Sequence, residues 1–372
     1  MCFSDTRTDV PNSTDLDNTR KRKADHTVGG TDEHGRSHRC SVAAASSTSW
    51  FVEQPETDTT DRSTWLPTFT KQPGYIGQKR MANAEPYEFL ELFLDESFWE
   101  LLTVETNRYM ACNKALSTAQ EKQLQVLDYV TVPEIKTFFA LYFAMGIVSQ
   151  CNLRDYWQTK NVITQTPAFH DVMSRNRWCA IWTHLHFSDN TKAVPRGEPG
   201  FDRLFKIRQL INTVVSKFCT HYQAAKELSL DEMVIAFKGK STLKQYNPRK
   251  PDKWGFKAFV LCEAKTGYAL QWLLYSGRES DSDERAPPCS VSYNIVQKLV
   301  APHYGQGHII YMDSYYTSPD VADVLQENKC GLCGPCNVSR SGMPHDLRST
   351  RQSMTKGDPP VIRRNDHKLA CA

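Results

Sequence analysis

The sequence lacks any apolar run of about 18 residues, the length that a membrane-spanning helix needs. Its first residues, MCFSDTRTDVPNSTD, contain no apolar core of the kind found in signal peptides. Internal repeats are also missing, and the formal net charge is only +3. We therefore expect an intracellular protein with no membrane partner, and the net charge alone does not indicate what it binds.

Large aliphatic residues are scarce over residues 1–65, where Ser, Thr, Asp and Arg predominate. A segment of this composition cannot bury enough apolar surface to offset its conformational entropy, so we predict a disordered tail. The tail contains the basic run Arg20–Lys23. Such a run is typical of a nuclear import signal or a phosphate contact, and equally of a solvated charge cluster. The expected location is the nucleus.

Twelve cysteines are present, and inside a cell we expect them to be reduced thiols. The segment CGLCGPC places Cys330, Cys333 and Cys336 three residues apart. A structural zinc site needs four ligands, and no fourth ligand follows at the usual spacing. In a strand, Cys330 and Cys333 would also point to opposite faces. We therefore interpret them as buried or half-buried thiols in preference to a metal site.

The first half of the chain after the tail has the periodicity of helices. From about Glu85, apolar residues recur at helical spacing, and a second apolar segment opens with Thr131 as a plausible N-cap and Pro133 in the first turn. That second helix is apolar all round, so we expect it to be buried. Further helices are predicted over 177–189 and 203–226. The sequence thus predicts a mostly helical domain over residues 66–226.

After Glu227 the period changes to that of strands. Residues 227–237 alternate, and two strands in 253–277 are joined by a turn of the sequence AKTG. A helix, the short apolar strand 308–312, a helix capped by Ser318 and a last strand within 330–338 complete the pattern. This order predicts an α/β fold with a mixed sheet over residues 227–337. A polar, basic segment, 338–372, follows.

Two aspartates occupy comparable places in this predicted sheet. Asp231 lies in the first strand and Asp313 directly follows the strand 308–312. Two carboxylates that meet at strand ends repel each other unless a cation lies between them, and oxygen ligands of this kind suit Mg²⁺ or Mn²⁺. Metals held in this way can support phosphodiester chemistry. The alternative is that each aspartate merely ends a strand in a polar turn.

The segment Phe237–Lys257 follows the strand of Asp231 and carries one acid among many cations. Basic residues with interleaved aromatic rings are typical of a groove that follows phosphates while rings stack on bases or sugars. A solvated basic loop is the other interpretation. The predicted nucleic-acid contacts are Lys238, Lys240, Lys244, Arg249, Lys250, Lys253, Trp254 and Lys257.

Three blocks carry a resemblance to a known family. MSRNRWCAIWTHLHFSDN (Met173–Asn190), the block Leu228–Leu270, and IIYMDSYYTSPDVADVL resemble, in this order, the signature blocks of the piggyBac transposases and the proteins derived from them. The similarity runs from about Trp65 to the C-terminus. Several long blocks in the same order are more specific than any single motif.

The resemblance implies a ribonuclease-H-like catalytic domain inserted into a helical dimerisation and DNA-binding domain. It also implies three aspartates that hold two divalent metals, and DNA cleavage and strand transfer at TTAA sites. Asp231 matches the first catalytic position and Asp313 the second. The implied partners are double-stranded DNA, as transposon ends and TTAA target, and a second copy of the chain, with no small-molecule substrate.

The third aspartate of the family has no match in this sequence. Asp346, Asp358 and Asp366 fall in segments that resemble the start of the family's insertion, so none of them is assigned that role. From this we expect an incomplete ribonuclease-H-like core and an incomplete catalytic site. The alternative functions are a non-catalytic DNA-binding or interaction protein, or a decayed transposon remnant.

Overall fold

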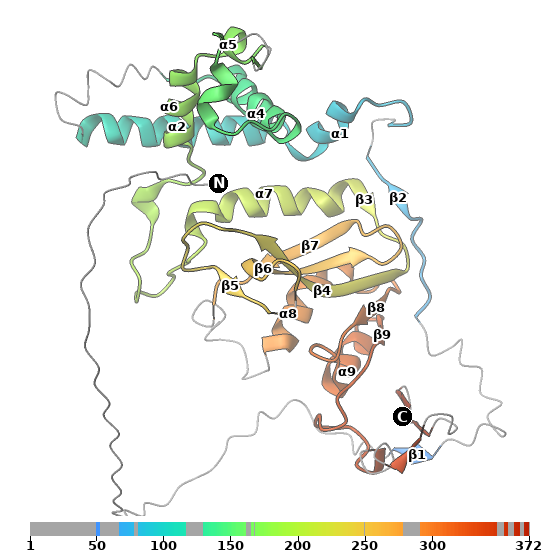
Figure 1. Ribbon diagram of the computed structural model, residues 1–372. Helices are drawn as coiled ribbons and strands as arrows, with labels where there is room; N and C mark the ends of the chain where they lie inside the picture. The colour runs from blue at the N-terminus through green and yellow to red at the C-terminus, as the bar shows by residue number, and fades with distance from the viewer. Residues whose placement is uncertain are drawn as a thin grey trace, which may run out of the picture.

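The computed structural model describes residues 50–52, 67–77, 81–116, 129–160, 165–166, 168–248, 250–277, 291–347, 353–355, 361–364 and 368–371. Arg249 and the basic run Arg20–Lys23 lie outside these ranges, as does most of the predicted disordered tail. Residues 50–52 of that tail are described, and Phe51–Val52 form a strand, so the prediction of disorder was wrong for these residues. Within them, no helix combines the length and apolar character needed to cross a membrane. Figure 1 shows the N-terminal helices gathered at one end of the molecule and the sheet with its helices below them.

The helical part consists of α1 (Pro86–Phe93), α2 (Glu96–Leu116), α4 (Val132–Ile147), α5 (Phe169–Val172) and α6 (Arg175–His184). The apolar periodicity from Glu85 onwards is divided between α1 and α2, with a break at Asp95. The Asp95 carboxylate accepts the backbone N–H of Phe98 at 3.1 Å. This cap begins a new helix because it satisfies a donor that the first turn leaves unpaired.

The helix α4 begins as predicted, although it is not buried all round. Thr131 and Glu134 form a reciprocal capping box before and within its first turn. Ile135, Phe138 and Leu141 are buried against α2 and α6, whereas Ile147 at the end of the helix is 87% exposed. The expectation of complete burial was therefore wrong, because only one stripe of the helix meets the neighbouring helices.

The helix α7 (Phe205–His221) connects the helical part to the sheet (Figure 1). It contributes Leu210 and Val214 to the core between the helices, and Cys219 to the core beside the sheet. The sequence predicts this helix to continue to residue 226, but it ends at His221. The next two residues form β3 (Tyr222–Gln223), which pairs with β2 (Gly74–Tyr75). Backbone pairing with a distant strand thus overrides the local helical preference.

The main sheet is mixed, as the order of elements predicts. Its strands are β4 (Glu227–Ala236), β5 (Gln245–Tyr246), β6 (Trp254–Glu263), β7 (Ala269–Leu274), β8 (Ile309–Met312) and β9 (Gly331–Cys333). The order across it is β5-β6-β4-β8-β9, with β7 also beside β6. β4 runs antiparallel to β6 and parallel to β8. The short strand β5 was not predicted, and β9 is shorter than the predicted strand.

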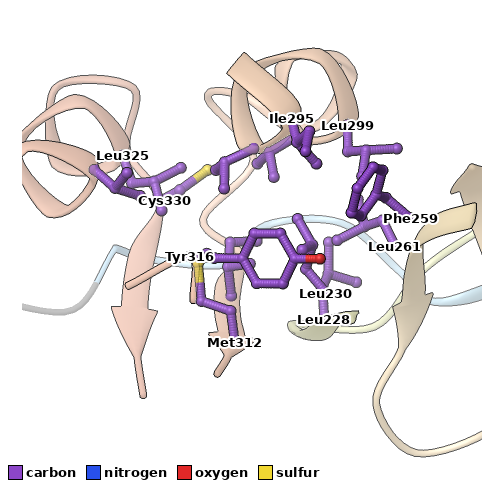
Figure 2. Packing of buried hydrophobic residues seen from close by; sticks show 14 of the residues in the cluster. Leu228, Leu230, Phe259, Leu261, Ile295, Leu299, Met312, Tyr316, Leu325 and Cys330 are labelled. Atoms are coloured by element: carbon purple, nitrogen blue, oxygen red, sulfur yellow. The ribbon is translucent and has the colours of Figure 1, made fainter. Parts of the chain in front are cut away.

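The two faces of this sheet differ in what covers them. On the core face, Leu228, Leu230 and Leu261 are no more than 1% exposed, and they pack under α8 (Val291–Val300) and α9 (Pro319–Glu327). Figure 2 shows the Tyr316 ring beside Leu228, Leu230 and Met312 in this core. The residues that alternate with these along the strands form the outer face, and this face carries Asp231.

The remaining described elements are short. The 3₁₀ turns are η2 (Leu153–Trp157), η3 (Asn190–Lys192) and η5 (Ala301–His303). Beyond the sheet, β1 (Phe51–Val52) pairs with β10 (Ile362–Arg364), which pairs with β11 (Leu369–Cys371). The segment 338–372 therefore meets a strand that precedes the helical part.

Candidate active site and nucleic-acid interface

The strand register brings Asp231 and Asp313 to neighbouring positions. β4 and β8 run parallel, and their last registered pair is Leu230 with Met312. Asp231 and Asp313 each follow directly, and both are exposed. Neighbouring strands lie about 4.8 Å apart, so the backbones of the two aspartates lie close together where β8 ends. Asp231 does not end its strand, because β4 continues to Ala236.

Asp313 opens a turn that leads into α9. Its carboxylate accepts the backbone N–H of Tyr315 at 3.0 Å, and its carbonyl oxygen accepts the Thr317 hydroxyl at 2.8 Å. Ser318 then caps α9, accepting from the backbone N–H of Val321 at 3.3 Å. These bonds satisfy part of the turn locally. Asp313 is thereby fixed at the end of β8.

A third carboxylate, that of Glu232, lies beside these two on the core face. The Tyr316 hydroxyl donates to Glu232 Oε2 at 3.3 Å, and Tyr316 is fully buried. Burial, and then the charges of Glu232, Asp313 and Asp231, raise the pKa of Tyr316 above its usual value. Tyr316 therefore stays a neutral donor. Its hydrogen bond ties the turn after Asp313 to the strand that carries Asp231.

The donor set at this edge fits a hard divalent cation. Carboxylate oxygens are the ligands that Mg²⁺ and Mn²⁺ prefer, and water completes the shell when the protein supplies only two. In the part of the chain that the structure describes, no group of three His, Cys, Asp or Glu side chains gathers as a metal site. Asp346 instead accepts from Arg363 Nε at 2.7 Å, and Asp358 and Asp366 lie outside the described residues.

The basic segment folds back towards the carboxylates. Lys250 Nζ donates to the backbone carbonyl of Glu232 at 2.9 Å, next to Asp231. Lys244 Nζ donates to Gly239 O at 2.8 Å and lies 5.1 Å from the ring centroid of Trp254. The side chains of Lys238, Lys240, Lys253 and Trp254 are exposed. The structure thus places cations and an aromatic ring along one end of β4 and β6, although their contact with DNA stays a prediction.

Lys257 differs from the other predicted contacts. It lies three residues after Trp254 on β6, so strand alternation turns it to the core face. There its Nζ lies 4.9 Å from the ring centroid of Phe259 and 5.6 Å from that of Tyr315. The structure therefore separates Lys257 from the exposed cations, and its neighbours are aromatic rings.

Three residues at the site were not predicted from the sequence. Glu232 is adjacent to Asp231, so the paired acids in LSLDEMV were an available signal. Tyr316 stands in an aromatic pair that gives no hint of its partner. Arg340 donates to the backbone carbonyls of Ser314 and Tyr315 at 3.1 and 2.6 Å, a contact between distant segments that no local pattern indicates.

The cysteines near β9 lie in different surroundings. Cys330 is buried, with its Sγ 3.8 Å from the carbonyl oxygen of His303, and burial raises its pKa to about 11. Cys333 is exposed, and the Cys336 thiol lies 3.5 Å from Thr317 O. A raised pKa keeps the Cys330 thiol protonated and a poor metal ligand.

Comparisons with known proteins agree with the resemblance seen in the sequence. A family model described as Transposase IS4 matches residues 85–371. Human PiggyBac transposable element-derived protein 3 is 28% identical over 247 residues, which cover 64% of this chain and 38% of that protein. Human PiggyBac transposable element-derived protein 2 is 24% identical over 282 residues, 74% of this chain and 43% of that protein. This chain spans about two fifths of the length of these relatives.

A solved structure has a similar fold. The cryo-EM structure of a piggyBac transposase synaptic complex with hairpin DNA superposes with a TM-score of 0.61, covering 81% of this chain and 63% of that chain. The two sequences are 18% identical, so the likeness is one of fold.

Proposed function

This chain belongs to the piggyBac-type transposase family, and from that premise we propose that it binds double-stranded DNA and holds a divalent cation between Asp231 and Asp313. The observation that supports the proposal is the register of β4 with β8, which ends at Leu230 and Met312, directly before the two aspartates. Lys250, held on the carbonyl of Glu232, adds a positive charge beside them.

Each part of this edge has a distinct task in the proposed site. Asp231 and Asp313 supply oxygen ligands, and Mg²⁺ or Mn²⁺ bound there would supply the Lewis-acid chemistry of phosphodiester cleavage. Lys250 and the exposed lysines beside it attract the phosphates and position the backbone. The hydrogen bond from Tyr316 to Glu232 holds the two aspartates in a fixed relation.

Finer features of the family belong to the same proposal. The sheet would be the first part of a ribonuclease-H-like core, and the DNA bound would be transposon ends and TTAA targets. The chain would act as a homodimer in the nucleus. The domain limits predicted from the sequence, 66–226, 227–337 and 338–372, are also kept as proposals. Two separate apolar cores, one between the helices and one beside the sheet, support the first division.

Metal binding is the direct test. Titration of the full chain with Mn²⁺, followed by electron paramagnetic resonance, should reveal a bound ion. Asp231→Asn or Asp313→Asn should weaken its affinity at least tenfold because each removes one of two charged ligands. Glu227→Gln is the matched control, since it removes an exposed carboxylate from the same strand. Equal affinities in wild type and both aspartate variants would contradict the site.

DNA binding is tested by its dependence on salt. Fluorescence anisotropy with duplex DNA should show an affinity that falls steeply as salt rises. In the double variant Lys250→Glu, Lys253→Glu, the plot of log K against log salt should be less steep by about 2. The control is Lys265→Glu, an exposed lysine in the turn between β6 and β7. A double variant that binds like wild type would remove this segment from the interface.

A non-catalytic DNA-binding protein derived from a transposase is the second candidate. It is favoured by the finding that, over the described ranges, no third ligand joins Asp231 and Asp313. The two candidates differ in an excision assay with a TTAA-flanked element and Mg²⁺ or Mn²⁺. We expect this chain to produce no excision. Excision that disappears in Asp231→Ala would identify it as an enzyme.

A further inference from the structure

Two aromatic rings stand exposed at the end of the sheet, beyond the carboxylates. Tyr246 on β5 and Trp254 on β6 are cross-strand partners, with ring centroids 4.8 Å apart and planes inclined by 44°. Tyr246 is 53% exposed and Trp254 is 52% exposed. We call these two residues the ring pair. Two large rings that touch each other and keep half their surface in water form an exposed apolar patch, a feature that can mark a binding site.

The ring pair lies on the same face of the sheet as the carboxylates. Asp231 is registered opposite Val260, and Trp254 precedes Val260 by an even number of residues on the same strand. Side chains an even number apart point to one face, so Trp254 shares the outer face with Asp231. Six residues at about 3.3 Å each put the ring pair roughly 20 Å from Asp231 along the sheet.

The surface between them is apolar and exposed. Met233 and Ile235 follow Asp231 at two-residue steps on β4, so they also lie on the outer face, and they are 44% and 39% exposed. Together, Met233, Ile235 and the ring pair form what we call the outer track. Between Asp231 and the ring pair, the outer-face residues of β4 carry no charge.

The end of the track is rigid. Gly255 lies beside Trp254, and a Cβ at this glycine would lie 2.2 Å from the carbonyl oxygen of Ile235. Only glycine permits this close approach of β6 to β4. The backbone N–H of Phe237 donates to Trp254 O at 3.2 Å, and that of Asn247 donates to Lys253 O at 2.7 Å. These contacts hold the backbone that carries the two rings.

Cations accompany the track. Lys244 Nζ lies over the Trp254 ring, Lys253 is exposed next to it, and Lys250 is held at Glu232 near the other end. A ligand that suits the track needs flat apolar groups to cover the rings and negative charges for the lysines. Nucleic acid has both, but in a paired duplex the base faces are hidden within the stack. Only unpaired bases present them.

We propose that the ring pair binds an unpaired base of a DNA strand whose phosphodiester lies at Asp231 and Asp313. The inference rests on the proposed function and adds the form of the DNA to it. At 3.4 Å per stacked nucleotide, a track of roughly 20 Å corresponds to about six nucleotides between the carboxylates and the stacked base. The ligand class is thus partly unpaired DNA, in which opened bases lie near the site of reaction.

The test compares two labelled DNAs of equal length and charge, one fully paired and one with a short internal mismatch that leaves bases unpaired. We expect the full-length wild-type chain to bind the mismatched DNA more tightly. Trp254→Ala should reduce that preference by on the order of tenfold, because stacking on an aromatic ring contributes about that much per base. Trp254→Phe, which keeps a ring, should retain most of it. Tyr87→Ala, which removes a 59% exposed ring from α1, should change nothing in the ratio.

The outcomes separate this inference from the proposed function. Suppose that wild type binds both DNAs tightly and with equal affinity, and that Trp254→Ala also binds both equally. This result would overturn the ring pair as a base site, while the proposed function stands. No binding of either DNA would overturn both. A loss of the preference in Trp254→Ala but not in Trp254→Phe, with unchanged thermal unfolding in both, would establish the stacking role. The same ratio in all variants would make the track a surface for another partner, contrary to our inference.

Discussion

The two faces of the main sheet are built from alternate residues of the same strands, yet they have opposite properties. On the core face, Leu228 and Leu230 are at most 1% exposed, whereas Met233 on the outer face is 44% exposed. Asp231 and Glu232 are neighbours in sequence, but Asp231 faces outward and Glu232 reaches the buried Tyr316. The core face holds the fold together, whereas the outer face of β4 leaves Asp231 and Met233 open to ligands, although Ala258 and Val260 of β6 are buried on that same face.

The division also assigns different tasks to similar side chains. Glu232 receives a hydrogen bond from inside the protein, whereas Asp231 and Asp313 receive hydrogen bonds from the backbone nearby. A carboxylate that gives up a hydrogen bond from the core to bind a ligand lowers the stability of the fold. Exposed carboxylates with local partners can take up a cation at little such cost. The faces should therefore respond differently to substitution and to pH.

The largest difference should follow from truncating one side chain on each face. Leu230→Ala should lower the free energy of unfolding by about 2–5 kcal/mol, since it removes a fully buried side chain and leaves a cavity. Met233→Ala should lower it by less than about 1 kcal/mol, because the side chain is half exposed. Urea unfolding of the two variants measures both values. Similar losses would mean that the outer face is also part of the folding core.

The next effect should come from acid, acting on the core side. His303 is 5% exposed, its Nε2 lies 3.9 Å from Cys219 Sγ, and its ring lies 5.5 Å from that of His308. Burial, and then the neighbouring His308, lower the pKa of His303 from 6.5 to about 4. Because the folded state binds the proton less readily than the unfolded state, a neutral His303 contributes to the free energy of unfolding, and this contribution is complete above pH 6.5. The contribution, about 3 kcal/mol in total, is lost as the pH falls towards 4.

Urea unfolding between pH 7.5 and pH 4.5 measures this loss. In His303→Gln, which cannot titrate there, the free energy of unfolding should vary less with pH than in wild type. The remaining slope reports the carboxylates and His308, whose pKa is also lowered by burial. Identical slopes in wild type and variant would show that His303 does not cause the loss of stability in acid.

The smallest of the three effects concerns a hydrogen bond on the core face, between Tyr316 and Glu232. Tyr316→Phe removes the hydroxyl that donates to Glu232 and leaves the ring packed, so the free energy of unfolding should fall by about 1 kcal/mol. A double-mutant cycle with Glu232→Gln should give a coupling of similar size, which urea unfolding can measure. Additive losses would mean that the turn after Asp313 does not depend on Glu232.

Much of the fold could be predicted because its signals are local. The capping box of Thr131 with Glu134, the cap of Ser318 and the turn between β6 and β7 each depend on residues a few positions apart, and all three are present. The errors came from long-range contacts. The helix α7 ends early because β3 pairs with β2. The helix α4 is exposed along one side because α2 and α6 pack on its other side.

The candidate site was predictable in its residue types but not in its geometry. Asp231 and Asp313 stand out as acids in strand contexts, and the lysines between them stand out by number. That Lys257 faces the core while Trp254 faces outward follows only from where β6 begins. The contact of Arg340 with the turn after Asp313 joins segments that no spacing rule relates.

By itself the sequence determined which segments form helices and strands, where several of them begin, and which side chains can bind metal or phosphate. These properties depend on near neighbours along the chain. Only the tertiary structure decided that β4 pairs with β8 in the register that sets Asp231 beside Asp313. A shift of one residue would have turned every side chain of a strand to the opposite face. The register is selected by the packing of the whole core, to which distant segments contribute together.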